Sequence, residues 1–219
     1  GVSTQPRKTE GSYMPVFLAG KAVADGVASA AGVPIDYFSH QQGHIRAAEI
    51  GLETPETYLG VHLSGGTTEI LKICQKGYTA EILGATQDIA AGQWVDRTGV
   101  KLGLDFPAGR ALETLACQTE TAAPFTVTVK GIDLFFSGAE TQTKQAIDKG
   151  VAKEEIARGV FVSLGRALSK AITRAHQATG LAYALVAGGV SANQLVKAVV
   201  TERCAKMAKQ LKVAFADPL

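Results

Sequence analysis

Residues Ser64 to Thr67 have the types and spacing of a loop that binds an anion. Two adjacent glycines, Gly65 and Gly66, allow successive backbone N–H groups to point toward one ion, and the hydroxyls of Ser64 and Thr67 add donors. A phosphate fits such a loop without a lysine. An ordinary hairpin turn has the same signature, so this stretch alone leaves both interpretations open.

Two histidines, His40 and His44, lie four residues apart in a segment with helical spacing. Side chains at this spacing lie one turn apart on the same helix face, so both imidazoles can reach one metal ion. The alternative is a pair of surface or half-buried polar side chains. A helical metalloprotease site places Glu directly after the first His, but Gln41 stands there and does not accept a proton at neutral pH.

A second glycine pair, Gly188 and Gly189, follows a buried apolar run and opens a helical segment that includes Asn193. Where a strand leads through glycines into a helix, the backbone can approach a nucleotide closely and the helix N-terminus favours a phosphate or ribose oxygen. The alternative is that the glycines only allow tight packing of strand against helix.

Alternating strands and helices must position these residues, which predicts an α/β protein. Ser12 is the expected N-cap of the first helix and Gly32 its end, whereas the first seven residues have the composition of a loop. A loop at 52–57 divides the chain into an expected first lobe, residues 1–57, and a second lobe, residues 58–219. Helices are predicted over residues 12–31, 40–50, 88–102, 109–118, 139–148 and 154–176, and from Gly188 onward. Strands are predicted over residues 33–39, 58–63, 69–74, 78–86, 133–138 and 182–187, the second to fourth of these forming an antiparallel meander.

Composition narrows the class of protein. A chain of 219 residues with 46% apolar residues can bury a sizeable core in one large domain or two small ones. Its net charge of +2, without long charged runs, gives no electrostatic case for nucleic acid or membrane binding. Cys74, Cys117 and Cys204 fit neither a disulfide framework nor a Cys-x-x-Cys metal site, and no signal peptide or long apolar run is present, so we expect a cytoplasmic protein.

Six motifs together resemble one family, the TsaD-like proteins that form threonylcarbamoyladenosine in tRNA and were once named O-sialoglycoprotein endopeptidases or glycoproteases. In chain order, the motifs are His-x-x-Gly-His, Leu-Ser-Gly-Gly-Thr-Thr-Glu, Gly-Ala-Thr-x-Asp-x-Ala-Ala-Gly-x-x-x-Asp, Leu-Gly-Leu-Asp-Phe-Pro-Ala-Gly, Phe-Ser-Gly and Ala-Gly-Gly-Val-Ser-Ala-Asn. The resemblance implies the actin-like ATPase fold, with two lobes built on RNase H-like mixed sheets. It also leads us to expect a family member that lacks both ends.

The resemblance also implies ligands and a site. It places an adenine nucleotide such as ATP on the Ser64–Thr67 loop, with Asp96, Gly109, Glu113 and Asn193 along the ribose and base, and it makes His40 and His44 ligands of a divalent metal, Fe or Zn. tRNA and proteins of the tRNA-modification machinery are the implied partners. We further expect the incomplete first lobe to favour a dimer or a protein partner.

His62 is the third expected metal ligand, because it stands where a Tyr reaches the metal in archaeal and eukaryotic relatives that this chain resembles. Val61 and Leu63 alternate with it along the strand, which turns His62 toward the opposite side. Three imidazoles suit Zn²⁺, Fe²⁺ or Ni²⁺ better than Mg²⁺. The alternative is a strand histidine that is hydrogen-bonded to a neighbouring carbonyl.

Four positions depart from the family pattern. Gln42, Ile89 and Gln93 stand where the family usually has acids, and Glu140 stands where it has Lys. Because metal–phosphate sites depend on charges at fixed places, the departures favour a divergent paralogue with impaired or altered transferase activity. The alternative is a non-catalytic nucleotide-binding partner of the tRNA-modification machinery. A metal-dependent glycoprotease, as in the older family name, ranks third.

Overall fold

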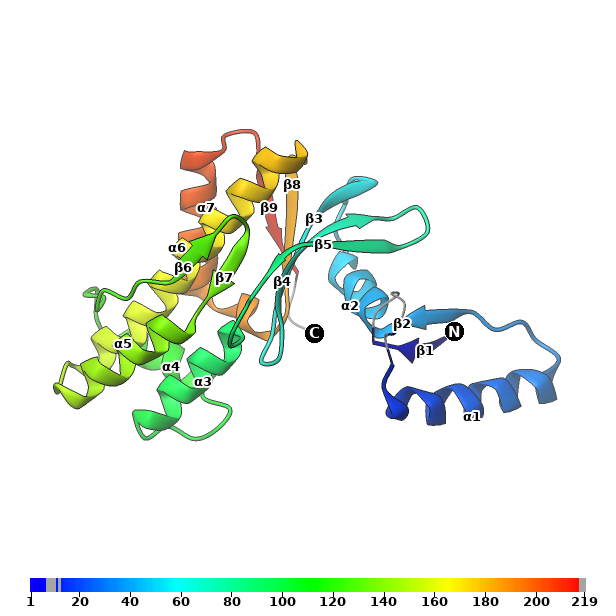
Figure 1. Cartoon of the computed structure of the whole chain (residues 1–219), viewed down its shortest axis with the longest axis horizontal. Coiled ribbons are helices and arrows are strands. Elements are labelled where there is room, and N and C mark those ends of the chain that lie inside the picture. The colour runs from blue at the N-terminus through cyan, green and yellow to red at the C-terminus, as the bar shows by residue number, and fades with distance from the viewer. Residues whose placement is uncertain (7–10, 12, 217–219) are drawn as a thin grey trace.

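The computed structural model describes residues 1–6, 11 and 13–216, and its centre is a five-stranded mixed sheet. The strands are β3 (Thr57–Leu63), β4 (Thr68–Cys74), β5 (Thr79–Ala85), β8 (Tyr183–Ala187) and β9 (Lys212–Phe215). Their order across the sheet is β5-β4-β3-β8-β9 (Figure 1). β3, β4 and β5 are antiparallel neighbours, which confirms the predicted meander, whereas β3, β8 and β9 run parallel.

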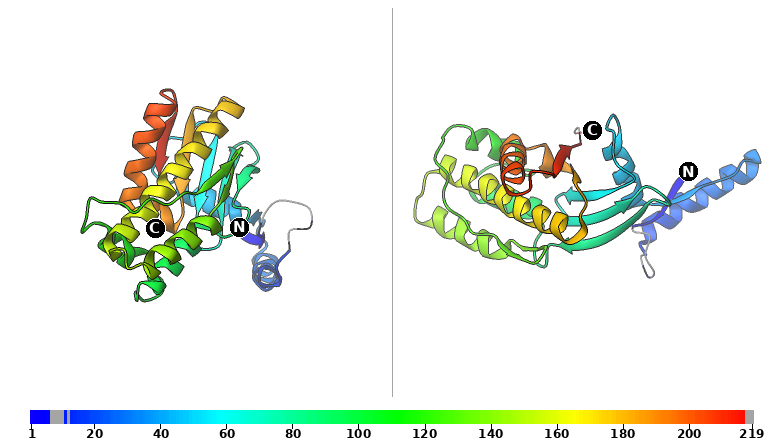
Figure 2. Two further views of the ribbon diagram at one scale, coloured as in Figure 1. Left: turned by 60° about the vertical axis from the view of Figure 1, so that its left-hand side comes forward. Right: turned by 90° about the horizontal axis from the view of Figure 1, so that it is seen from above.

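Helices cover one face of this sheet and enclose the main core (Figure 2). They are α3 (Ala91–Lys101), α4 (Gly109–Ala116), α5 (Ser137–Asp148), α6 (Lys153–Thr179) and α7 (Gln194–Met207), with a short hairpin of β6 (Thr128–Lys130) and β7 (Asp133–Phe135). The predicted apolar stripe of α6 is confirmed, because Ile156, Val160, Leu164, Leu168 and Ile172 are fully buried. Each such side chain contributes about 1.5–3 kcal/mol to folding.

The opposite face of the sheet carries α2 (His40–Glu49), the helix of the histidine pair. Ile45 and Ala48 of α2 pack on Tyr58 and other apolar side chains of the sheet. The buried carboxylate of Glu49 accepts the Tyr58 hydroxyl at 2.6 Å and pairs with Arg46 at 2.6 Å. Burial and the bond to Glu49 raise the pKa of Tyr58, so its hydroxyl remains a donor. These contacts fix the histidine helix to the sheet.

The first part of the chain forms a small unit of β1 (Val2–Gln5), α1 (Pro15–Ala31) and β2 (Tyr37–Ser39) that extends away from the body (Figures 1 and 2). β1 pairs in parallel with β2, so the prediction of a loop at the start of the chain is wrong. α1 ends at Gly32, as predicted, in the left-handed conformation with φ 63°. The expected N-cap, Ser12, lies outside the described residues. No side chain of α1 is buried.

Two predicted helix starts are displaced. The helix expected from Asp88 begins only at Ala91, because the Asp88 carboxylate accepts backbone N–H groups of Phe136 and Ser137 at the start of α5. The helix expected at Gly188 is a 3₁₀ turn, Gly189–Ala192, followed by α7 with Asn193 as its N-cap. Both shifts arise from tertiary or local polar contacts that helix periodicity does not register.

Candidate functional site

Hydrogen bonds of its own side chains hold the loop between β3 and β4 in shape. The hydroxyl oxygen of Ser64 accepts the backbone N–H groups of Gly66 at 3.3 Å and Thr67 at 3.0 Å. The Thr67 hydroxyl lies 2.9 Å from the Ser64 hydroxyl and 3.0 Å from Nδ1 of His62. Gly65 and Gly66 are exposed at the tip, and a Cβ at either would meet no atom within 4 Å. The loop is therefore ordered, while its outer side stays open.

Two glycines bring other elements into contact with this loop. A Cβ on Gly92, at the start of α3, would lie 2.6 Å from the Cα of Gly65 and 2.7 Å from the carbonyl oxygen of Ser64. Gly188 has φ 107°, and a Cβ there would lie 2.2 Å from the carbonyl oxygen of Leu63. Tight packing thus accounts for Gly188, whereas a Cβ at its neighbour Gly189 would point into open space.

Asp96, Glu113 and Asn193 each accept a backbone N–H group at the start of a helix. The Asp96 carboxylate accepts the N–H of Ala108, directly before Gly109, the first residue of α4, at 2.9 Å. Glu113 of α4 accepts the N–H of Gln194 at 2.7 Å, and Asn193 caps α7. The predicted nucleotide-binding residues therefore lie on a closed series of contacts that runs from the β3–β4 loop through α3, α4 and α7 to the Gly188 turn and back to β3.

The three predicted metal ligands lie next to one another. The Nε2 atoms of His40 and His44 are 2.9 Å apart, and the ring centres of His44 and His62 are 5.6 Å apart. Burial, and then the charge of His40, lower the pKa of His44. In the part of the chain that the structure describes, no three His, Cys, Asp or Glu side chains are arranged to hold a metal ion.

The histidines open onto a pocket of about 560 Å³ between α2 and the sheet. Its polar end contains the three histidines together with Ser64, Thr67 and Glu69, and its other end is apolar. The residues at the starts of α3, α4 and α7 do not line this pocket. The metal and nucleotide parts of the candidate site therefore meet only at the β3–β4 loop.

Glu69 is the site residue that the sequence analysis missed. It pairs with His62 across the β3–β4 hairpin, is 5% exposed, and lies 3.5 Å from the amide nitrogen of Gln41. A buried carboxylate beside three imidazoles favours cations at this end of the pocket. The available signal was the hairpin register, because a turn at residues 64–67 places position 69 opposite position 62.

Two of the four departures from the family pattern serve helix starts. The side-chain oxygen of Gln42 accepts the N–H of Ser39 at 2.7 Å, and that of Gln93 accepts the N–H of Ala90 at 3.0 Å. Glu and Gln both fill this position of a capping box. These two glutamines therefore keep a structural role that an acid would also fill.

The other two departures differ in kind. Ile89 packs against the main core. Glu140, in the first turn of α5, pairs with Lys144 at 2.7 Å and with Arg97 of α3 at 3.4 Å. A lysine at position 140 would face these two cations and be repelled by them. The charge at this position is therefore the opposite of that in the family pattern, and Arg97 and Lys144 supply the complementary charges.

Residues 11–217 match the family described as "TsaD: tRNA N6-adenosine threonylcarbamoyltransferase". Curated relatives of that name include one from Thermus thermophilus, 37% identical over 185 residues, and one from Caulobacter vibrioides, 33% identical over 203 residues. These alignments cover 83% and 86% of this chain but 56% and 55% of the relatives, so the chain spans about half the length of the proteins it matches.

Solved structures show the fold. HypF from T. kodakarensis matches with a TM-score of 0.69 and 13% identity, over 90% of this chain and 36% of that one. The activator of 2-hydroxyisocaproyl-CoA dehydratase from Clostridium difficile, solved with bound ADPNP, matches with a TM-score of 0.53 and 14% identity, over 91% and 75%. The predicted actin-like ATPase fold is confirmed. Among the helices described, none is long and apolar enough to cross a membrane.

Proposed function

Because this chain belongs to the TsaD family, whose described members are tRNA N6-adenosine threonylcarbamoyltransferases, we propose that it binds an adenine nucleotide and a divalent metal in support of threonylcarbamoyl transfer. The nucleotide site is the series of contacts from the β3–β4 loop to the Gly188 turn. The metal site is the histidine end of the pocket.

The observation that carries the proposal is the convergence of two glycine turns and three helix starts. Backbone N–H groups at such turns bind phosphate oxygens, and the N-termini of α3 and α7 add positive potential. A phosphate at the tip of this loop would take the N–H groups of Gly66 and Thr67, which now donate to the Ser64 hydroxyl. The carboxylates of Asp96 and Glu113 and the amide of Asn193 supply acceptors for ribose hydroxyls.

The histidine pair fits a divalent metal. Two ligands about 2.1 Å from one ion lie roughly 3.0–3.4 Å apart, close to the 2.9 Å between the Nε2 atoms of His40 and His44. His62 is the nearest further imidazole, and Glu69 adds negative charge at the same end. Imidazole ligands suit Fe or Zn. A metal held there would neutralise phosphate charge or polarise a carbonyl oxygen of the transferred group.

Mutation of the histidines tests the metal site. We expect the wild-type chain to bind one Zn²⁺ or Fe²⁺ in calorimetry and the His40→Ala, His44→Ala double variant to bind at least about tenfold more weakly. His176→Ala is the matched control, because that ring lies at the end of α6 against the carbonyl of Leu181. Equal metal affinity in the double variant would refute the assignment.

A second candidate function is a non-catalytic nucleotide-binding partner within the tRNA-modification machinery. The ion pairs of Glu140 with Arg97 and Lys144 favour it, because they place an acid where the family pattern has a lysine. Threonylcarbamoyl transfer to tRNA, measured with the wild type and with Glu140→Lys, separates the two functions. Activity in the wild type supports the enzyme, whereas activity only in Glu140→Lys, with unchanged nucleotide binding in both, supports the partner.

A further inference from the structure

The charges of this chain are separated along the sequence, although their sum is small. Between residues 156 and 216, nine lysines and arginines stand against one acid, Glu202. The rest of the chain carries 13 cations and 19 acids. The net charge of +2 therefore hides a strongly basic segment, residues 156–216, which contains most of α6 and all of β8, α7 and β9. Charge asymmetry of this kind indicates a polyanionic partner.

The fold places part of this segment on two adjacent helices. α6 and α7 pack side by side where Gly165 lies against Val199, and the thiol of Cys204 interacts with Ser169. The residue after each of these α6 positions, Arg166 and Lys170, is exposed.

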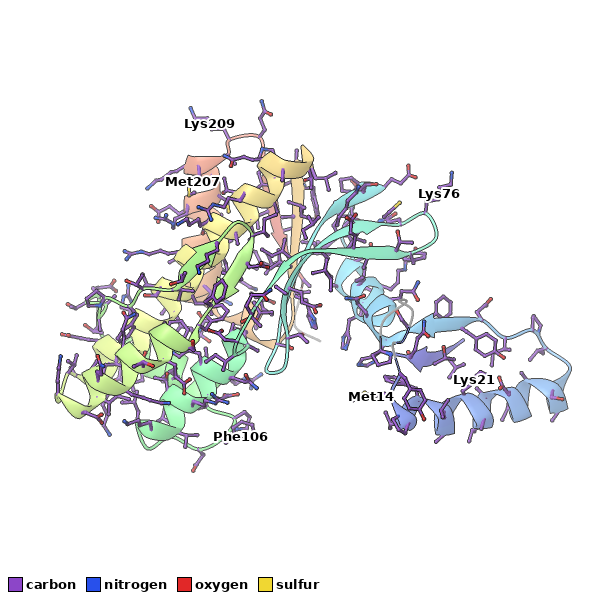
Figure 3. The ribbon with its side chains drawn as sticks, viewed as in Figure 1. Met14, Lys21, Lys76, Phe106, Met207 and Lys209 are labelled. Carbon is purple, nitrogen blue, oxygen red and sulfur yellow. The ribbon has the colours of Figure 1, made fainter. Side chains whose placement is uncertain are left out.

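α7 and the turn after it complete the surface. Arg203 is half-buried, Lys206 and Lys209 are exposed, and Figure 3 shows Lys209 at the end of α7. We name Arg166, Lys170, Arg203, Lys206 and Lys209 the basic face.

Internal contacts use other cations of the segment and leave the basic face largely unpaired. Arg158 pairs with Glu120, and Arg174 donates to the carbonyls of Val129 and Gly131. By contrast, Arg166, Lys170 and Lys209 form no ion pair with any residue that the structure describes. Ion pairing among the described residues therefore does not account for these three cations.

Arg203 and Lys206, the other two cations of the basic face, form few polar contacts with the described residues. Lys206 pairs with Glu202. The buried Nε of Arg203 has no hydrogen-bond partner among residues 1–6, 11 and 13–216, and one terminal nitrogen contacts only the Met207 sulfur at 3.9 Å.

We propose that the basic face binds the phosphate backbone of the tRNA on which the proposed function acts. This inference rests on that function. α7 begins in the nucleotide site at Asn193 and ends at the basic face, and its 14 residues span about 21 Å. A folded RNA reaches both ends, whereas a mononucleotide does not. Met207 is the sole large apolar side chain on α6 or α7 that is exposed among the described residues, which favours RNA over a membrane surface.

Salt-dependent binding of an unmodified tRNA transcript tests the proposal. In the triple variant Arg166→Gln, Lys170→Gln, Lys209→Gln, we expect affinity at low salt to fall about tenfold or more. The slope of log affinity against log salt should also become shallower by about 2–3, because three lost phosphate contacts mean that fewer counterions are released on binding. The control is Lys72→Gln, Lys76→Gln, Lys149→Gln, which removes three exposed cations outside the segment and should change affinity less than about twofold.

Three outcomes would overturn the proposal: equal tRNA affinity in the triple variant and wild type, an equal loss in the control, or wild-type binding to anionic vesicles but not to tRNA. A parallel ATP titration distinguishes this inference from the proposed function. Unchanged ATP binding with weakened tRNA binding in the triple variant supports the basic face. If the wild type does not bind ATP and only the triple variant loses tRNA affinity, the nucleotide site is refuted. The basic face is then still supported.

Discussion

Single residues here have meanings that depend on the atoms around them. Gln42 and Gln93 stand where the family pattern has acids. Both side chains nevertheless accept the N–H of the residue three positions earlier, as Glu does in a capping box. Glu140 is different, because two neighbouring cations complement its reversed charge. Residue identity could predict that these positions had diverged, but only the hydrogen-bond partners show that Gln42 and Gln93 keep a capping role.

Gly92 is the residue whose change should most directly disturb the β3–β4 loop. A methyl group there would lie 2.6 Å from the Cα of Gly65, so Gly92→Ala must displace the loop. We expect a loss of about 1–3 kcal/mol in stability and at least tenfold weaker nucleotide binding, measured by urea unfolding and calorimetry. Gly26→Ala in α1 is the control, because a Cβ there meets no atom within 4 Å. Nucleotide affinity that is unchanged in Gly92→Ala would contradict the assigned role of the loop.

At the scale of elements, the sequence predicted the meander, the long helix α6 and the strand before Gly188, because their apolar periodicity matches the faces they bury. It did not predict β1, β9 or the start of α3. β1 and β9 are four-residue strands, too short for a periodic signal, and α3 is delayed by hydrogen bonds from a distant helix. Such contacts are set by tertiary structure.

The start of α5 gives a pH-dependent prediction. Burial would raise the pKa of Asp88, but hydrogen bonds from the Ser137 side chain and from backbone N–H groups together lower it. A lowered pKa means that this carboxylate stabilises the fold above its unfolded pKa, about 3.9, and loses the contribution as the pH falls through its folded pKa. We expect Asp88→Asn to lose about 0.5–2 kcal/mol at neutral pH.

Urea unfolding at a series of pH values checks this expectation. The stability difference between the wild type and Asp88→Asn should stay constant above about pH 5 and shrink below about pH 4. Asp105→Asn, in the loop between α3 and α4, should differ from the wild type by less than about 0.5 kcal/mol. A difference for Asp88→Asn that does not change with pH would show that its charge is not what holds α5.

At the scale of the whole molecule, α1 stands apart from the body with an uncovered apolar side. Val16, Val23 and Val27 recur at helical spacing and are 69%, 68% and 63% exposed. Exposed apolar stripes of this kind favour association. The sequence analysis expected exposed apolar surface in this part of the chain, whereas the basic face was missed because the net charge sums over the whole chain.

In light scattering, we expect the average molar mass of the wild-type chain to rise with concentration. The average molar mass of the Val23→Lys, Val27→Lys double variant should stay at the monomer value. The matched control, Ile82→Lys, Val100→Lys, changes two exposed apolar residues of the body and should behave as the wild type. A wild-type chain that remains monomeric at high concentration would show that α1 does not mediate self-association.

Calorimetric titration of ATP into the wild type, Gly65→Val and Gly26→Val tests most directly whether the two glycine turns form a nucleotide site. Gly65 lies at an open tip where a Cβ meets no atom within 4 Å, so the fold tolerates valine while the side chain fills the space beside the loop N–H groups. We predict one ATP per chain in the wild type and Gly26→Val and no measurable binding in Gly65→Val. Absence of binding in the wild type, or equal affinity in Gly65→Val, would contradict the account.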